Sequence, residues 1–115
     1  MKPQHMKTIH RVISTFGERN QKMQTLEELM ELQSALFENI HRGTDNRKNI
    51  VEEIADVEIM MAQMKEVFNI QPNEIEEVQD YKLGRLEHTI DKYITKQNGQ
   101  IQALVQIDRD TSNGR

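Results

Sequence analysis

Cysteine is absent from this chain, which excludes disulfide bonds and thiolate chemistry. Tryptophan is also absent, and aromatic residues make up only 4% of the sequence, so we expect a core of aliphatic side chains and methionines. A glycine-rich phosphate-binding loop is missing too, which excludes a nucleotide site of the Walker type.

An excess of positive charge is lacking as well, since the formal net charge is −4 and no basic patch occurs in the sequence. Duplex nucleic-acid binders usually carry such a patch, so we expect no nucleic-acid partner. No segment is apolar over the length of a transmembrane helix, and residues 1–11 lack the apolar run of a signal peptide. We therefore expect a cytoplasmic protein that does not enter a membrane.

Proline and glycine are sparse, and the few that occur divide the sequence into four segments with helical periodicity. Pro3 and Pro72 stand where helices can begin, and Gly17 and Gly43 interrupt the pattern between them. The predicted helices span about residues 4–16, 19–41, 45–68 and 73–95. Because the connections are short, we predict an all-α fold, an antiparallel four-helix bundle.

The chain length of 115 residues argues for one domain, which we assign to residues 1–95. Residues 96–115 form a polar C-terminal tail, and we expect its end to fray. Alternatively, four apolar residues in the tail would form a short docking element: Ile101, Leu104, Val105 and Ile107.

Two pairs of acidic residues, each with a spacing of three, lie on the second and third predicted helices. Glu28 and Glu31 form the first pair, and Glu53 and Asp56 form the second. A spacing of three on a helix places both side chains on one face, one turn apart. Four carboxylates converging from two packed helices would repel one another unless cations neutralise them. A magnesium-dependent phosphate-processing site needs such an arrangement.

On the third predicted helix, the second acidic pair borders an apolar stripe. The stripe contains Ile50, Ile54, Val57, Met61, Met64 and Phe68. Glu53 and Asp56 fall on its flank, whereas Glu52 points away from it. Burying an unpaired carboxylate is costly or forces it to bind a proton, and a metal ion removes that problem. The alternative is that both acids reach solvent at the margin of the stripe.

On the second predicted helix, Glu28 and Glu31 lie opposite the main apolar stripe that begins at Leu26. A purely solvated face would not need the neighbouring Leu32, and the small Ala35 beside the acids indicates close packing. We therefore expect this helix to be buried on two sides, with the acids on the second side.

The fourth predicted helix supplies basic residues. Lys82 falls in the middle of an apolar stripe that runs from Ile75 to Tyr93, and Arg85 lies at its edge. A lysine in such a position usually extends its charge to an edge or an interface. The functional interpretation is that Lys82 and Arg85 bind an anion, such as phosphates bridged by magnesium.

The motifs occur in a characteristic order. Phe16-Gly17 and Gln21 are followed by Glu27-Glu28-Leu29-Met30-Glu31-Leu32, then by Glu53-Ile54-Ala55-Asp56-Val57, and finally by Lys82 and Arg85. This order resembles the MazG-like nucleotide pyrophosphohydrolases, especially the short single-domain forms of phages and bacteria. The resemblance implies an all-helical fold, a homodimer or homotetramer, and magnesium-dependent hydrolysis of nucleoside triphosphates to monophosphate and pyrophosphate. Manganese would be a substitute metal.

The resemblance also implies roles for individual residues. The metal ligands would be Glu28, Glu31, Glu53 and Asp56. Glu27 would support metal binding or orient the water, while Lys82 and Arg85 would hold phosphates. The base would be read from the first helix and the start of the second, by His10, Phe16 and Gln21.

Two other classes of protein compete with this interpretation. A di-iron carboxylate bundle needs two Glu-x-x-His motifs, whereas the chain has one, from Glu38 to His41, at a helix end where the helix dipole favours histidine. A non-catalytic helical interaction module is the stronger alternative, because it would account for the methionine-rich stripes. It would not account for Lys82 in mid-stripe or for the paired acids.

Overall fold

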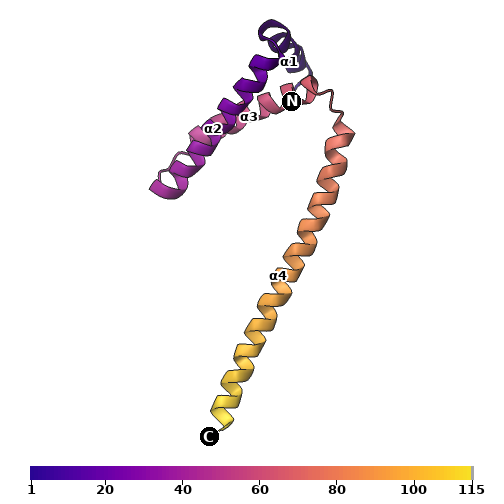
Figure 1. Ribbon diagram of the computed structural model, residues 1–115. Helices are drawn as coiled ribbons and strands as arrows, with labels where there is room; N and C mark the ends of the chain where they lie inside the picture. Colours follow the sequence, from indigo (N-terminus) through magenta and orange to yellow (C-terminus); the bar gives the residue numbers. More distant parts are fainter. Residues whose placement is uncertain (115) are drawn as a thin grey trace. The chain divides into compact units, whose positions relative to one another are not determined.

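The computed structural model describes the backbone of residues 1–114 and the side chains of residues 1–111. Over this range the protein is all-α, as predicted, and contains no strand. Its four helices are α1 (Pro3–Phe16), α2 (Glu18–Arg42), α3 (Arg47–Val67) and α4 (Pro72–Gly114) (Figure 1). In the described residues, no helix combines the length and the apolar character needed to cross a membrane.

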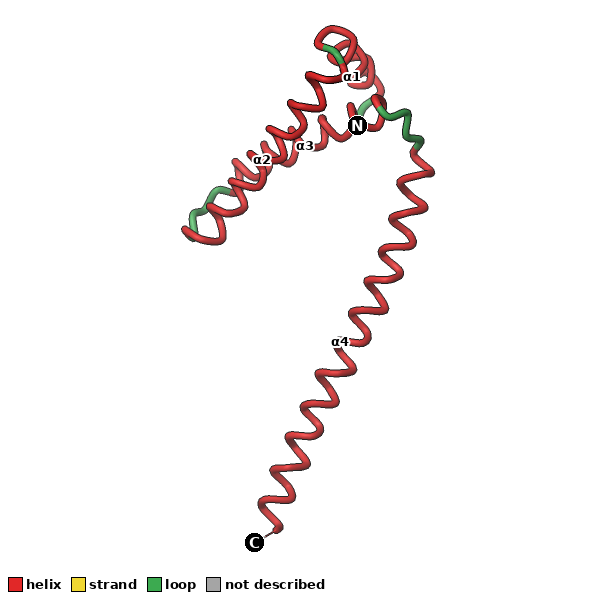
Figure 2. The backbone as a smooth tube through the Cα atoms, viewed as in Figure 1, coloured by secondary structure: helices red, strands yellow, loops and turns green. Residues whose placement is uncertain are grey.

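Proline and glycine set the helix boundaries, and they do so where the sequence indicates. Pro3 and Pro72 occupy the first turns of α1 and α4, where a missing N–H costs nothing. Gly17, with φ of 91°, separates α1 from α2, and Gly43, with φ of 61°, ends α2 in the left-handed conformation. The connections that result are short (Figure 2). The predicted boundaries of the first three helices agree with the observed ones to within about two residues, as expected for helix ends.

The end of the fourth helix was predicted wrongly, because α4 continues past residue 95 to Gly114. Its apolar periodicity does not stop at Tyr93 but continues through Ile101, Leu104 and Ile107. No proline follows Pro72, and Gly99 inside a helix costs only about 1 kcal/mol relative to alanine. Residues 96–114 are therefore helical, although their polar composition suggested a fraying tail.

The chain divides into two units, Met1–Gln71 and the segment that begins at Pro72, and each is described by itself. In the first unit, α2 and α3 pack side by side along much of their length, and α1 packs against both (Figure 1). The second unit is the single helix α4. The buried apolar residues of the first unit are few: Ile9, Ala35 and Met60.

Buried polar side chains accompany this small core. The Gln21 Nε2 group on α2 donates to Gln63 Oε1 on α3 at 2.7 Å, and both side chains are buried. Thr25 Oγ1 donates to the Gln21 carbonyl oxygen, also at 2.7 Å. Leaving one partner of such a buried hydrogen bond unpaired costs roughly 1–3 kcal/mol, so the Gln21–Gln63 pair favours one alignment of α2 on α3.

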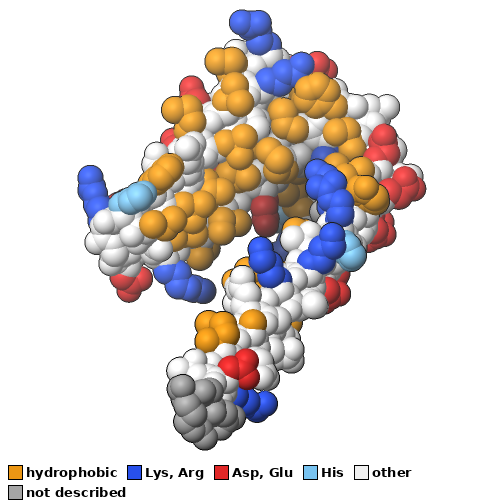
Figure 3. Space-filling view, turned by 60° about the horizontal axis from the view of Figure 1, so that its bottom comes forward, with side chains coloured by type: hydrophobic (Ala, Val, Ile, Leu, Met, Phe, Trp, Pro, Cys, Tyr) orange, Lys and Arg blue, Asp and Glu red, His pale blue; other side chains and the backbone are white. Residues whose placement is uncertain are grey.

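The side of α2 that packs against α3 is therefore its polar side. Thr25 and Ala35 on that side are 5% and 3% exposed, whereas Met30 and Ile40 on the apolar stripe are 64% and 71% exposed. Hydrophobic side chains accordingly gather on the surface of the first unit (Figure 3). This arrangement agrees with a helix that carries its acids on a second packing side, and it leaves the first side uncovered within the unit.

Candidate metal centre

The α2–α3 pair brings together the four acids singled out in the sequence. One carboxylate oxygen from each of Glu28, Glu31, Glu53 and Asp56 lies within 4.8 Å of the others. The prediction that the two pairs face each other is thus confirmed. A structure with Glu28 and Asp56 on opposite surfaces would have contradicted it.

Local structure explains this convergence. Each pair spans one helical turn, and the four-residue connection between Arg42 and Arg47 sets α2 and α3 next to each other. The small side chain of Ala35 permits a close approach of the helices. Asn46 Nδ2 in the connection donates to the Ala35 carbonyl oxygen at 2.9 Å, and Asn39 Nδ2 donates to Asn46 Oδ1 at 3.2 Å. These bonds fasten the connection to α2 and help to fix the alignment of the two acidic pairs.

Two of the converging carboxylates are partly buried, and each has an unpaired oxygen. Oε2 of Glu28 and Oε2 of Glu53 are buried without a hydrogen-bond partner. The other oxygen of Glu28 accepts a hydrogen bond from Gln24 Nε2 at 3.0 Å. No lysine or arginine in the described part of the chain forms an ion pair with any of the four acids. The cluster therefore has acceptor atoms and negative charge to offer to a cation.

The clustering of the acids changes the pKa of Glu31. The negative charge of Glu28 foremost, and that of Glu53 in addition, raise the pKa of the Glu31 carboxyl above its ordinary value. Like charges in one site disfavour ionisation of their neighbours, and the neutral form of Glu31 relieves part of the repulsion.

A pH dependence of stability follows from the raised pKa of Glu31. A carboxyl whose pKa is higher in the folded state contributes stability below the ordinary pKa of glutamate, about 4.3, and this contribution is lost as the pH rises through the raised pKa. In metal-free buffer, the Tm of the parent protein should therefore fall relative to that of Glu31→Gln as the pH increases from about 4 to about 7. Thermal melts of both proteins, with Glu52→Gln as the control, measure the difference. Parallel pH profiles for the parent and Glu31→Gln would contradict the expectation.

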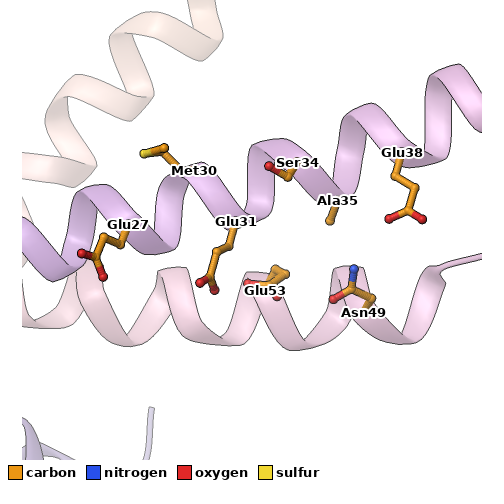
Figure 4. A pocket seen from close by; sticks show the side chains of 8 residues that line it. All are labelled: Glu27, Met30, Glu31, Ser34, Ala35, Glu38, Asn49 and Glu53. Atoms are coloured by element: carbon orange, nitrogen blue, oxygen red, sulfur yellow. The ribbon is translucent and has the colours of Figure 1, made fainter.

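A pocket of about 430 Å³ opens beside the acids, between α2 and α3. In Figure 4 the Glu31 side chain reaches from α2 toward α3, next to Glu53. The remaining lining residues are Glu27, Met30, Ser34, Ala35, Glu38 and Asn49. Glu27, for which the sequence predicted a supporting role, thus shares a pocket with two of the proposed metal ligands.

The predicted base-reading residues lie outside this pocket. His10 on α1 contacts Glu66 on α3, with 2.5 Å between Nδ1 and Oε1. Phe16 at the end of α1 is 57% exposed, and Gln21 is buried with its amide bonded to Gln63. The structure therefore groups the acids with one another but does not group these three residues with them.

The predicted phosphate-binding residues lie on the second unit. Lys82 and Arg85 both belong to α4 and both are exposed. The Arg85 guanidinium lies 6.0 Å from the centre of the Tyr81 ring.

Sequence reasoning missed three polar residues of the pocket, Ser34, Glu38 and Asn49. A signal for them was present, because Ser34 and Glu38 follow Glu31 at spacings of three and seven and Asn49 precedes Glu53 by four. Residues at those spacings share a helical face, so extending the acidic faces by one or two turns would have identified them.

No protein-family model matches the chain, and neither a curated protein nor a solved structure matches it. The resemblance to the MazG-like family accordingly depends on the residues quoted above.

Proposed function

We propose that the protein is a magnesium-dependent nucleoside triphosphate pyrophosphohydrolase that cleaves ribo- or deoxyribonucleoside triphosphates to monophosphate and pyrophosphate. The observation that supports this most is the convergence of four carboxylates within 4.8 Å, two of which have buried, unpaired oxygens. Hard divalent cations bind such oxygen donors, and Mg²⁺ characteristically combines a few carboxylates with substrate phosphates. Mn²⁺ would be accepted by the same donors.

The four carboxylates suit a divalent cation by their negative charge as well as by their oxygen ligand atoms. Four ionised carboxylates would place four negative charges in one cluster, and the raised pKa of Glu31 reflects the resulting repulsion. A divalent ion offsets this repulsion and gives the unpaired oxygens of Glu28 and Glu53 a partner. Glu28, Glu31, Glu53 and Asp56 are the residues that would hold it.

The chemistry divides between metal and protein. Magnesium held by the four acids would supply positive charge to the phosphates and would lower the pKa of a coordinated water. Glu27 orients this water or supports the metal ligands. The water would give one proton to solvent; as its oxygen bonds to the α-phosphorus, the bond from that phosphorus to the α–β bridging oxygen would break, and pyrophosphate would leave. Lys82 and Arg85 neutralise the charge that develops on the phosphates. No protein nucleophile takes part.

We further propose how the helices and the copies of the chain assemble. The α4 stripe that carries Lys82 covers the apolar surface of the first unit and completes an antiparallel four-helix bundle, and copies of the chain associate as a homodimer or homotetramer. The uncovered apolar stripe of α2 supports this part, because an isolated first unit would leave Met30, Phe37 and Ile40 more than half exposed.

The same uncovered stripe favours a second candidate, a non-catalytic helical module that binds another protein. The two candidates differ in what they require of the acids. An interaction module has no use for a pocket lined by Glu27, Glu31 and Glu53, and the enzyme depends on it.

Incubation with a panel of ribo- and deoxyribonucleoside triphosphates and Mg²⁺ tests the function. We expect equimolar nucleoside monophosphate and pyrophosphate, no reaction with a chelator, and activity with Mn²⁺ in place of Mg²⁺. Release of orthophosphate in place of pyrophosphate would exclude the proposed bond cleavage. A complete lack of hydrolysis across the panel would favour the interaction module.

A further inference from the structure

A second pocket adjoins the acid-lined one toward the end of α2. Its volume is about 360 Å³, and the residues that line it all belong to α2: Ser34, Phe37, Glu38, His41 and Arg42. Ser34 and Glu38 line both pockets, so the second continues from the first. With Leu26 at 0° on the helical wheel, Ser34 and Glu38 fall at about 80° and 120°. The second pocket therefore occupies the flank of α2 between its apolar stripe and its acidic side.

An aromatic pair lines the second pocket. The rings of Phe37 and His41 stack on each other, with their centroids 5.3 Å apart and their planes inclined by 15°. Both side chains are exposed, and Phe37 keeps 51% of its accessible surface. Residues four apart on a helix are neighbours, so local geometry alone accounts for the stacking. Because the pair is exposed in a pocket next to the acids, it offers a platform to a planar ligand.

Polar side chains lie between the acids and the aromatic pair. In Figure 4, Ser34 and Glu38 follow Glu31 along α2, and Asn49 lies on the facing helix α3. Phe37 comes six residues after Glu31, which corresponds to about 9 Å along the helix axis. The surface thus changes from carboxylates through polar groups to aromatic rings. A nucleotide bound through its metal-held phosphates presents its sugar and then its base in the same order.

We propose, on the basis of the proposed function, that the base of the nucleoside triphosphate stacks on the Phe37–His41 pair and that the sugar lies beside Ser34 and Asn49. The three residues that the sequence predicted to read the base line neither pocket, so the end of α2 takes over their role. Every base has a π-face, and stacking is therefore tolerant of base identity. The preference of the protein among the bases should accordingly be modest.

Tryptophan fluorescence tests the stacking without turnover. The chain contains no tryptophan, so Phe37→Trp and Phe16→Trp each introduce one fluorophore. Phe16 is the matched control, because it is 57% exposed and was the aromatic residue predicted from the sequence to read the base. The probe is a nucleoside triphosphate analogue with a methylene group in place of the α–β bridging oxygen, added with Mg²⁺. It should quench the fluorescence of Phe37→Trp and leave that of Phe16→Trp unchanged, and inorganic tripolyphosphate, which has no base, should quench neither.

Calorimetric titration of the full chain measures the contribution of the ring. Phe37→Leu keeps an apolar side chain and removes the aromatic platform. We expect its Kd for the methylene analogue to rise about 5- to 150-fold, the loss typical of removing one ring that stacks on a base. Its Kd for tripolyphosphate with Mg²⁺ should equal that of the parent. Phe37→Tyr keeps the ring and should bind the analogue like the parent, as should Phe16→Leu.

The outcomes separate this inference from the proposed function. If the parent releases pyrophosphate from nucleoside triphosphates but Phe37→Leu binds the analogue as tightly as the parent does, the stacking on Phe37 is wrong and the function stands. Quenching in Phe16→Trp in place of Phe37→Trp would return the base to the end of α1 and overturn the inference alone. A parent that binds neither the analogue nor tripolyphosphate and releases no pyrophosphate would overturn both.

Discussion

Glu53→Gln should reduce the magnesium-dependent turnover of nucleoside triphosphates by at least about 10²–10³-fold, as expected when one electrostatic group is removed from a transition-state site. Glutamine keeps the shape of the side chain and removes the negative charge. Glu53 is partly buried between α2 and α3, and its Oε2 atom has no hydrogen-bond partner. Of the four acids, Glu53 and Glu28 are thus the two whose buried oxygens lack a partner that a cation would supply.

The same substitution should leave folding intact. In metal-free buffer Glu53→Gln should be neutral or stabilising, because it removes one of the like charges that raise the pKa of Glu31. Magnesium binds the folded parent and should raise its Tm by mass action, more than it raises the Tm of the variant.

Glu52→Gln is the matched control for both measurements. Glu52 precedes Glu53 directly, is exposed, and does not belong to the four-acid cluster. It should therefore retain the parental turnover and the parental magnesium shift. If magnesium shifted the Tm of Glu53→Gln as much as that of the parent, ligation by Glu53 would be ruled out.

The four-acid cluster could be predicted because it depends mainly on local rules. A spacing of three fixes one face of a helix, and the short connection around Gly43 fixes which helix comes next to it. The second packing side of α2 could be predicted in the same way, because the small Ala35 beside Glu28 and Glu31 indicated that another helix packs closely there. In each case the information lay within a few turns of the residues concerned.

Two features were not predicted from the sequence, and the reasons differ. The Gln21–Gln63 hydrogen bond joins side chains 42 residues apart, and neither glutamine signals its partner in the sequence. The extent of α4 was missed for a different reason. Gly99 and the polar residues around it are typical of a loop, whereas the apolar spacing from Ile94 to Ile107 sustains the helix.

Lys82→Met should lower kcat/KM for nucleoside triphosphates by about 10- to 100-fold, the loss expected when one charge-assisted hydrogen bond to a phosphate disappears. Lys82 lies in the middle of the α4 stripe between Val78 and Leu86, where an apolar residue would be expected for packing alone. Methionine preserves the apolar stem and deletes the ammonium group. The variant should therefore fold and self-associate like the parent and bind Mg²⁺ at least as well.

Lys92→Met separates a specific role of Lys82 from a general effect of charge. It makes the same chemical change on the same helix, but Lys92 falls at about −100° on the helical wheel, away from the centre of the stripe that carries Lys82. Steady-state kinetics should show the loss for Lys82→Met alone, and sedimentation should show equal assembly of both variants. Unchanged kcat/KM in Lys82→Met would remove Lys82 from the phosphate site. An equal loss in Lys92→Met would reduce the effect of Lys82→Met to long-range electrostatics, because no contact with the phosphates is proposed for Lys92.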